Sequence, residues 1–259
     1  MRYIRLFRDI SNWWLHFMVK FGFTNQDPLV FKIRNNIKVE VPRRLLPEFK
    51  DIFMEGCYSR GLGIRVPDNP TVIDIGANAG FFSLFAAARF PGARIYSYEP
   101  IEINYSQLMR NVDLNERANI RCFRKAVFSH SGQLSLHYDT IDSLSTSATI
   151  LDHAGTQDRT IKVSCITLPE IFNEQGIERC DILKLDCEGS EYDILYKCPL
   201  SCLKMISQIV AEVHAGKEAD HNREALEAFL ELHGFSTRRY SRHMLGAWRP
   251  GINGQHGNH

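Results

Sequence analysis

The feature that most constrains the fold is a short apolar segment that runs directly into a glycine turn. Residues 72–75 are rich in β-branched side chains, as in a buried parallel strand, and an apolar segment with helical character follows at 81–89. Gly76 and Gly80 lie between the two segments. A strand, a glycine turn and a helix in this order bring bare backbone N–H groups to a ligand, and the helix N-terminus favours negative charge. We therefore expect a ligand site at the end of this strand.

An acidic residue beside this turn narrows the class of ligand. Asp74 lies at the end of the strand, and three residues separate Gly76 from Gly80, unlike the dinucleotide-binding Gly-x-Gly-x-x-Gly pattern. A carboxylate beside amide donors suits a zwitterion better than a pyrophosphate. The amino-acid end of S-adenosylmethionine is such a group. An ordinary tight strand–helix turn would contain the same glycines, so the turn alone leaves both interpretations open.

A second acid follows at the spacing expected for a nucleoside site. Residues 94–98 form the next predicted strand, which Pro100 ends, and Glu99 comes 19 residues after Gly80. An acid about 20 residues past a glycine turn, at the end of the next strand, is where ribose hydroxyls are bound. A solvated loop acid is the alternative. The two features together favour a nucleoside site.

A second group of ionisable residues occupies two later apolar segments, 181–186 and 208–214. Because alternate residues of a strand share a face, the two ionisable residues of each segment point to the same side. If the two segments are neighbouring strands, all four converge at the carboxyl edge of the sheet, and Glu188 follows just beyond. The four residues are Lys184, Asp186, Glu212 and His214.

A purely structural role would explain the same residues. Lys184 is costly to bury alone, and an ion pair with Glu212 would satisfy it and leave His214 exposed. Glu191 fits the start of the following helix, where negative charge is stabilised. The pattern of residues leaves the structural and the functional interpretation open.

Composition excludes several classes of protein. The chain has 259 residues, 44% of them hydrophobic and 24% charged, with a formal net charge of +1, which fits one globular α/β domain with additional N-terminal structure. Near neutrality gives no support for nucleic acid as a partner. Seven cysteines without a Cys-x-x-Cys pair are typical of reduced core residues, so we expect the cytoplasm. No segment reaches the ~18 apolar residues of a transmembrane span, and no signal-peptide pattern is visible.

The N-terminal part is predicted to be an accessory segment without visible chemistry. Residues 3–23 are amphipathic at helical spacing. They form either a helix packed on the domain or on a second copy of the chain, or a helix lying on a membrane surface, such as the periphery of the inner membrane. Residues 29–41 are predicted to form a hairpin around Asn35-Asn36, and 48–57 a helix. The predicted division is an accessory segment at 1–65, a main domain at 66–250 and a disordered tail at 251–259.

Strands and helices alternate through the main domain. After the strands at 72–76 and 94–98 we expect a helix at 103–114 and a third strand at 119–127. This alternation predicts a doubly wound, mostly parallel sheet of the Rossmann-like kind. Residues 128–168 interrupt it with alternating patterns typical of antiparallel strands. The hydroxyl-rich loop between them is either a lid or a disordered connection. A helix at 222–233 and two short strands at 235–241 and 243–249 close the domain.

When the glycine turn with Glu99 and the later group of ionisable residues are taken together, the sequence resembles the FkbM family of S-adenosylmethionine-dependent methyltransferases over about residues 70–250. The matching segments are Val72–Ser83, Tyr98-Glu99-Pro100 with Asn104 and Asn111, Thr167-Leu168, Asp181–Glu191 and Glu212-Val213-His214. The resemblance implies a seven-stranded class I methyltransferase sheet. It also implies O-methylation of a small-molecule or glycan acceptor, such as a sugar, a polysaccharide or a secondary metabolite, with S-adenosylhomocysteine as product.

The resemblance also implies roles for individual residues. The methionine part of the cofactor would be held around the glycine turn, the ribose by Glu99, and the adenine between Ile101 and residues 126–128. The full set of cofactor-binding candidates is Asp74, Gly76, Ala77, Asn78, Gly80, Phe81, Glu99, Pro100, Ile101, Asn104, Ala126 and Asp186. Asp186 and Glu188 would face the methyl group and the acceptor.

Methyl transfer needs an aligned acceptor oxygen and a base that removes its proton. We expect Asp186 or His214 to be that base, Glu188 to orient the acceptor, and Lys184 to set the local field. Oxygen ligands such as Glu212 could hold a divalent ion, but no spacing demands one, and no metal site is predicted. A nicotinamide-dependent oxidoreductase and a non-catalytic nucleoside-binding scaffold are the alternative functions.

Overall fold

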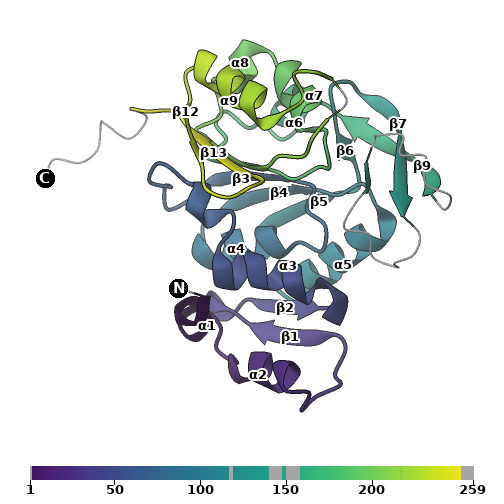
Figure 1. Cartoon of the computed structure of the whole chain (residues 1–259), viewed down its shortest axis with the longest axis vertical. Coiled ribbons are helices and arrows are strands. Elements are labelled where there is room, and N and C mark those ends of the chain that lie inside the picture. Colours follow the sequence, from purple (N-terminus) through teal and green to yellow (C-terminus); the bar gives the residue numbers. More distant parts are fainter. Residues whose placement is uncertain (1, 117–118, 140–147, 150–157, 217, 252–259) are drawn as a thin grey trace, which may run out of the picture.

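The computed structural model describes residues 2–116, 119–139, 148–149, 158–216 and 218–251. The predicted hydroxyl-rich loop, apart from Thr149, and the predicted tail from residue 252 lie outside the described residues. Figure 1 shows a central sheet with helices on both faces and a second sheet beside one edge.

The central sheet has seven strands in the order β12-β13-β11-β10-β3-β4-β5. Five neighbouring strands are parallel, and β12 and β13 form an antiparallel edge. The strands are β3 Thr71–Ile75, β4 Arg94–Tyr98, β5 Ile120–Phe123, β10 Ile182–Leu185, β11 Gln208–Glu212, β12 Ser236–Arg239 and β13 Met244–Trp248. The chain winds from β3 toward β5 on one side and from β10 toward β11 on the other. The order therefore reverses between β3 and β10, where doubly wound sheets bind their ligands. This confirms the predicted fold class.

Two layers of helices cover the sheet. One face carries α4 Phe81–Arg89 and α5 Glu102–Asp113, and the other carries α6 Leu168–Glu174, α7 Glu191–Tyr196, α8 Leu200–Leu203 and α9 Arg223–Leu232 (Figure 1). The expected helices at 81–89, 103–114 and 222–233 are confirmed to within a residue or two. Asn222 caps α9, because its side-chain oxygen accepts the Ala225 N–H at 2.9 Å.

The N-terminal residues add a further layer beyond α4 and α5 (Figure 1). It consists of α1 Arg2–Asp9, α2 Trp14–Lys20, β1 Leu29–Lys32, β2 Lys38–Val41, α3 Leu46–Lys50 and the short turns η1 Arg34–Asn36, η2 Arg43–Leu45, η3 Asp51–Glu55 and η4 Ser59–Gly61. The hairpin is confirmed, with Asn35 and Asn36 at positive φ. The single helix expected over 3–23 is wrong, because Ile10 leaves it to pair with Ile33. The helix expected at 48–57 begins at Leu46 and ends at Gly56, whose φ is 69°.

One hydrophobic core joins this layer to the sheet's helices. The Phe49 ring stacks on Phe31 with centroids 4.4 Å apart and meets the Phe81 ring edge-on at 6.1 Å. Phe53 meets Phe85 in the same way at 5.9 Å. All of these rings except Phe85 are buried. The boundary predicted at residue 65 therefore does not separate two hydrophobic cores. The division of the chain into an accessory segment and a main domain stays a prediction.

Asn111 on α5 and Asn115, two residues past the end of that helix, hold the edge of the hairpin. Asn111 accepts the Glu40 N–H at 2.7 Å and donates to the Glu40 carbonyl at 3.1 Å. Asn115, one turn later, does the same to Lys38 with both distances at 2.7 Å. Both side chains are buried, so they satisfy backbone groups that would otherwise lose water without a partner.

A second, four-stranded sheet contains β6 Ala126–Val127, β7 Gly132–Asp139, β8 Ala148–Thr149 and β9 Asp158–Ile166, in the order β6-β9-β7-β8. The antiparallel pairing of β7 with β9 confirms the expected antiparallel insertion. The single strand expected over 119–127 is wrong, because it breaks into β5 and β6, which belong to different sheets. Arg124 and Lys125 lie at the break and keep their charged groups partly or largely exposed.

Candidate functional site

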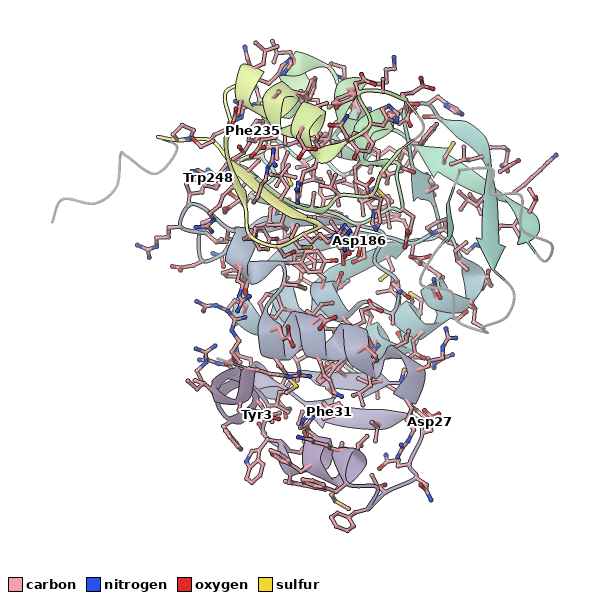
Figure 2. All side chains as sticks on the ribbon, in the orientation of Figure 1. Tyr3, Asp27, Phe31, Asp186, Phe235 and Trp248 are labelled. Carbon is pink, nitrogen blue, oxygen red and sulfur yellow. The ribbon has the colours of Figure 1, made fainter. Side chains whose placement is uncertain are left out.

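A cleft opens at the carboxyl ends of β3, β4 and β10 and reaches the second sheet. Asp186, directly after β10, lies near the middle of the molecule (Figure 2). The cleft is lined by Ile75, Gly76, Asn78, Tyr98, Glu99, Pro100, Ile101, Asn104, Ala126, Val127, Leu134, Leu136, Asp186, Cys187, Glu188 and Ser190. It occupies the switch point at which the strand order reverses, as predicted from the two motifs.

The glycine turn shapes this cleft, and three of its N–H groups already have acceptors within the chain. The N–H groups of Gly76 and Ala77 both donate to the Tyr98 carbonyl at 3.0 Å, and the Asn78 N–H donates to Glu99. Bare N–H groups, which were expected of the turn and the helix start as a whole, are therefore not found at these three positions. Gly76 has φ 73°, and a Cβ there would lie 1.8 Å from the Asp186 carbonyl oxygen. Glycine at this position lets the loops after β3 and β10 touch.

Glu99 is a buried carboxylate held by the backbone around it. One of its oxygens accepts the Ile101 N–H at 2.9 Å and the other accepts the Asn78 N–H at 2.9 Å. Burial raises the pKa of Glu99 to about 7, although the two N–H groups oppose that shift. The carboxylate therefore faces the cleft in a fixed orientation, with acceptor capacity left on each oxygen.

Asp74 lies behind the cleft and already has a cation. It is fully buried, accepts the Ser83 hydroxyl at 2.6 Å, and lies 3.2 Å from the Lys184 ammonium. Lys184 also donates to the Gly76 carbonyl at 2.6 Å. We expected Asp74 to hold the ammonium group of a ligand, but in the structure it pairs with the ammonium group of Lys184 instead. The alternative, a pairing of Lys184 with Glu212, is wrong. Burial works against the charge of Lys184, but Asp74 and Asp186 outweigh it and raise its pKa.

Two residues of the N-terminal layer complete this corner of the site. The Tyr58 hydroxyl donates to Asp186 at 2.6 Å, and the Asn78 amide donates to Glu48 at 3.2 Å. Burial, followed by repulsion from Asp186, raises the pKa of Glu48 to about 8. The segment at 1–65, in which no chemistry is visible from the sequence, thus contributes two side chains that hydrogen-bond to cleft residues. No local motif marks Glu48 or Tyr58, because only packing of the layer brings them here.

A network of His214 with two glutamates borders the other side of Asp186. His214 Nδ1 lies 2.9 Å from Glu191, and Nε2 lies 3.6 Å from Glu188. Burial lowers the pKa of His214, but the hydrogen bond and charge of Glu191 outweigh it and raise the pKa to about 9. Glu191 begins α7 as expected, and it also accepts the N–H groups of Cys187 and Gly189.

Glu188 is a partly exposed member of this network that lines the cleft. Its side chain is 28% exposed and its backbone has φ 52°, a conformation that few non-glycine residues adopt. Burial raises its pKa to about 7, and the charge of His214 opposes that shift. Asp186 has a similar exposure of 27%. Burial and the charge of Asp186 raise the pKa of Glu212, which lies outside the cleft lining.

The structure brings most of the predicted site residues to one cleft. Those that line it are Gly76, Asn78, Glu99, Pro100, Ile101, Asn104, Ala126, Asp186 and Glu188. Those that do not line it are Asp74, Ala77, Gly80, Phe81, Lys184, Glu212 and His214. Sequence reasoning missed the apolar wall from β7, Leu134 and Leu136, because its alternating pattern predicts a strand but not what the strand faces. Within the described residues, no group of three or more His, Cys, Asp or Glu side chains is arranged to hold a metal ion.

A seven-stranded sheet of this order, with its cleft at the switch point, is the fold of class I methyltransferases. Residues 74–237, more than half of the chain, match the family described as the methyltransferase FkbM domain, and the chain belongs to that family. As a member of it, the protein is an S-adenosylmethionine-dependent methyltransferase. Among the residues described, no helix is both long and apolar enough to cross a membrane.

Several characterised proteins are similar to the chain. It is 28% identical over 220 residues to methyltransferase sdnD of Sordaria araneosa, a match that covers 74% of this chain and 82% of that protein. It is 27% identical to the 31-O-demethyl-FK506 methyltransferase FkbM of Streptomyces tacrolimicus, with 73% and 80% covered. The hexuronic acid methyltransferase AglP of Haloferax volcanii is 22% identical, with 55% of each chain covered. The crystal structure of methyltransferase FkbM from Methylobacillus flagellatus has a TM-score of 0.48 at 15% identity, over 79% of this chain and 54% of that one.

Proposed function

We propose that the protein transfers a methyl group from S-adenosylmethionine to a hydroxyl group of a sugar, a glycan or a secondary metabolite. The observation that carries this proposal is the pair of partly exposed carboxylates, Asp186 and Glu188, in the same cleft as Glu99. One end of the cleft then suits a nucleoside, and the other suits a group that must lose a proton. The names of AglP and of the FK506 enzyme support hydroxyl-bearing acceptors of these two kinds.

The residues of the cleft fit the cofactor by their chemistry. Ile101, Leu134 and Leu136 offer an apolar surface for an adenine ring, and Glu99 offers two oriented oxygens for ribose hydroxyls. The side-chain oxygen of Asn78 is buried at the cleft with no hydrogen-bond partner among the described residues. An ammonium group of the methionine part would satisfy it. The bound cofactor supplies a methyl group on a sulfonium leaving group.

We assign proton removal to Glu188 rather than to His214. The raised pKa of His214 keeps it protonated near neutrality, and Lys184 is held as a cation by two carboxylates. Glu188 has a pKa of about 7, which suits a general base, and it lines the cleft. Asp186, whose one oxygen already accepts the Tyr58 hydroxyl, would orient the acceptor hydroxyl toward the methyl group.

Calorimetric titration with S-adenosylhomocysteine tests the cofactor half of this proposal. We expect tight binding to the wild-type protein, loss of about tenfold or more in the Glu99→Gln variant, and no change in Glu178→Gln, an exposed control. NADH should not bind. Wild-type affinity in Glu99→Gln, with its thermal transition intact, would contradict the assignment of Glu99.

The acceptor half needs a separate assay. The protein is incubated with S-adenosylmethionine and panels of glycosides, hexuronic acids and polyketide alcohols, and methylated products are found by mass spectrometry. Methylation of a hydroxyl that is lost in Glu188→Gln supports the assignment, and methylation only at nitrogen or carbon contradicts O-methyl transfer. We also propose a cytoplasmic location, which the seven free cysteines support, because such thiols persist in a reducing compartment.

A further inference from the structure

Exposed hydrophobic side chains are concentrated at the N-terminus of the chain. Of the eleven large hydrophobic residues that are exposed in the described part of the chain, seven lie between residues 3 and 23. These seven, which we call the N-terminal aromatic surface, are Tyr3, Ile4, Phe7, Trp13, Trp14, Phe21 and Phe23. Single exposed apolar residues are ordinary, but a cluster of this size marks an interaction site.

Ring contacts make this surface continuous across α1 and α2. Phe17, at its centre, stacks on Tyr3 at 6.1 Å and on Phe21 at 6.3 Å, and it packs against Trp13 at 6.1 Å. Trp13 meets Phe7 edge-on at 5.0 Å. The rings are therefore held in place before any partner binds. Trp and Tyr are the residues that membrane proteins place at the boundary between lipid and water.

The N-terminal segment that carries the aromatic rings is basic, and one of its basic side chains lies over two of the rings. The Lys20 ammonium lies over Tyr3 at 5.9 Å and over Phe21 at 5.8 Å from the ring centroids. Four basic residues and one acid, Asp9, occur between positions 2 and 23. An amphipathic segment with aromatic residues on one side and basic residues at the edge is typical of a surface that lies in the lipid headgroups.

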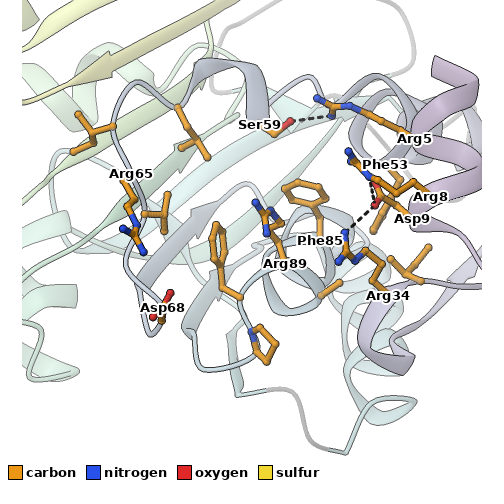
Figure 3. Close-up of a pocket in the computed structure, with 17 residues that line it drawn as sticks. Arg5, Arg8, Asp9, Arg34, Phe53, Ser59, Arg65, Asp68, Phe85 and Arg89 are labelled. Atoms are coloured by element: carbon orange, nitrogen blue, oxygen red, sulfur yellow. Dashed lines mark hydrogen bonds and ion pairs between the residues drawn. The ribbon is translucent and has the colours of Figure 1, made fainter. Parts of the chain in front are cut away.

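A hollow lined by arginines adjoins α1 (Figure 3). Its volume is about 880 Å³, and its lining includes Arg5, Arg8, Arg34, Arg65 and Arg89 with only two acids, Asp9 and Asp68. Asp9 serves two of these arginines, Arg8 at 2.6 Å and Arg34 at 3.5 Å. Burial and the charges of Arg60 and Arg8 lower the pKa of Arg5. Positive charge is therefore in excess in the hollow, which borders α1 at Arg5, Arg8 and Asp9.

We propose that the N-terminal aromatic surface docks on a bilayer that contains anionic phospholipids, with the arginines of the hollow facing the lipid phosphates. The charge distinguishes this partner from a second copy of the chain. A symmetric dimer through this surface would bring the same basic edge against itself, and like charges in contact oppose association. An anionic bilayer complements both the rings and the charge. Docking of this kind is independent of the acceptor proposed above.

Vesicle binding of the full-length protein tests this inference. The protein is sedimented with vesicles of phosphatidylcholine alone and with vesicles of equal parts phosphatidylcholine and phosphatidylglycerol. We expect binding at least about tenfold stronger to the anionic vesicles, reduced by added salt. Two of the three tryptophans, Trp13 and Trp14, belong to the surface, so brominated lipids should quench the protein's fluorescence.

Matched variants separate the two parts of the surface. Phe7→Ser with Trp14→Ser should weaken binding about tenfold, whereas Leu232→Ser, an exposed apolar residue on α9, should not. Arg8→Gln with Arg89→Gln should weaken binding to anionic vesicles about tenfold, and the exposed Arg242→Gln should leave it unchanged. Phe23→Ser, at 74% exposure, repeats the first test at a position that barely touches the fold.

Three results would overturn the inference. They are equal binding to neutral and anionic vesicles, a loss with Leu232→Ser as large as that with the aromatic variants, or no sedimentation with either kind of vesicle. If the last is accompanied by a dimer in analytical ultracentrifugation that Phe23→Ser dissociates, the surface binds a second copy instead.

Discussion

At the scale of single residues, the site is controlled by how its carboxyl groups are partnered. Glu99, Glu48 and Glu188 have pKa values of about 7, 8 and 7, all raised first by burial, whereas Lys184 and His214 are kept cationic by neighbouring acids. The three glutamates therefore change charge near neutral pH, where the enzyme would work. Perturbed pKa values of this kind recur at functional sites.

Replacing Glu188 by Gln removes the proposed base while keeping its shape. We expect kcat to fall by about 10²- to 10³-fold, with the affinity for S-adenosylhomocysteine unchanged. In the wild type, kcat/KM should rise as the pH passes through about 7, because Glu188 must be ionised. Retention of this pH dependence in Glu188→Gln would assign it to another residue.

The Tyr58 hydroxyl lies 2.6 Å from Asp186 and should orient it. We expect Tyr58→Phe to lower kcat about tenfold, because the carboxylate loses one fixed partner while Lys184 remains. Steady-state kinetics with the identified acceptor measures the effect. An unchanged kcat would limit Tyr58 to packing.

The charged form of His214 contributes to the free energy of unfolding. Its pKa is raised from 6.5 to about 9 in the folded protein, so its charged contacts contribute fully below about pH 6.5 and are lost as the pH rises through about 9. We expect His214→Gln to destabilise the protein by roughly 1–3 kcal/mol at pH 6 and by much less at pH 10. Urea unfolding at both pH values measures the difference. A loss that is equal at both would mean that charge is not involved.

At the scale of elements, side chains at the contact between α5 and the β1–β2 hairpin bond backbone groups that a neighbouring strand would otherwise bond. Asn111, in α5, and Asn115, two residues past its end, bond both backbone groups of Glu40 and of Lys38 in β2. The hairpin needs no third strand, because the helix supplies its partners.

Asn111→Ala should therefore leave buried backbone groups of the hairpin and the Ala79 carbonyl without partners. We expect a loss of about 2–3 kcal/mol in the free energy of unfolding. The exposed Asn119→Ala is the matched control and should change it by less than about 0.5 kcal/mol. Comparable losses in both variants would mean that amide pairing is not the cause.

Elements whose residues carry a local signal were predicted well from the sequence. The strand at 71–75, its glycine turn and the helix at 81–89 each depend on periodicity and on glycine, which act over a few residues. The break at 124–125 depends on which sheet the next strand pairs with. The position of Tyr58 beside Asp186 depends on packing between residues 128 positions apart in the sequence. Local patterns do not contain that information.

At the scale of the whole molecule, the N-terminal layer and the sheet form one packed body. The cluster that includes Leu6, Phe31 and Phe49 continues into Val72, Phe81 and Ile95 of the sheet and its helix. The same layer provides Glu48 and Tyr58 to the cleft. The layer is thus part of the enzyme's core and part of its site.

We expect thermal unfolding to be a single cooperative transition, because no boundary between separate cores lies near residue 65. Phe31→Ala, deep in the layer, should lower that one transition and destabilise the whole protein by about 3–5 kcal/mol. Scanning calorimetry measures both. A separate early transition in the variant would show that the layer unfolds alone.

The second sheet has a consequence for how enzymes of this kind could diverge. Its first and last strands pair with each other, Ala126 beside Cys165 and Val127 beside Ile166, so the segment between them leaves and rejoins the fold at adjacent points. It also provides four of the residues that line the cleft. A recombination event, or a chimera made at the bench, could exchange this one continuous segment and present a different apolar wall to the adenine end of the cleft. The glycine turn, Glu99 and the carboxylates after β10 would be inherited unaltered.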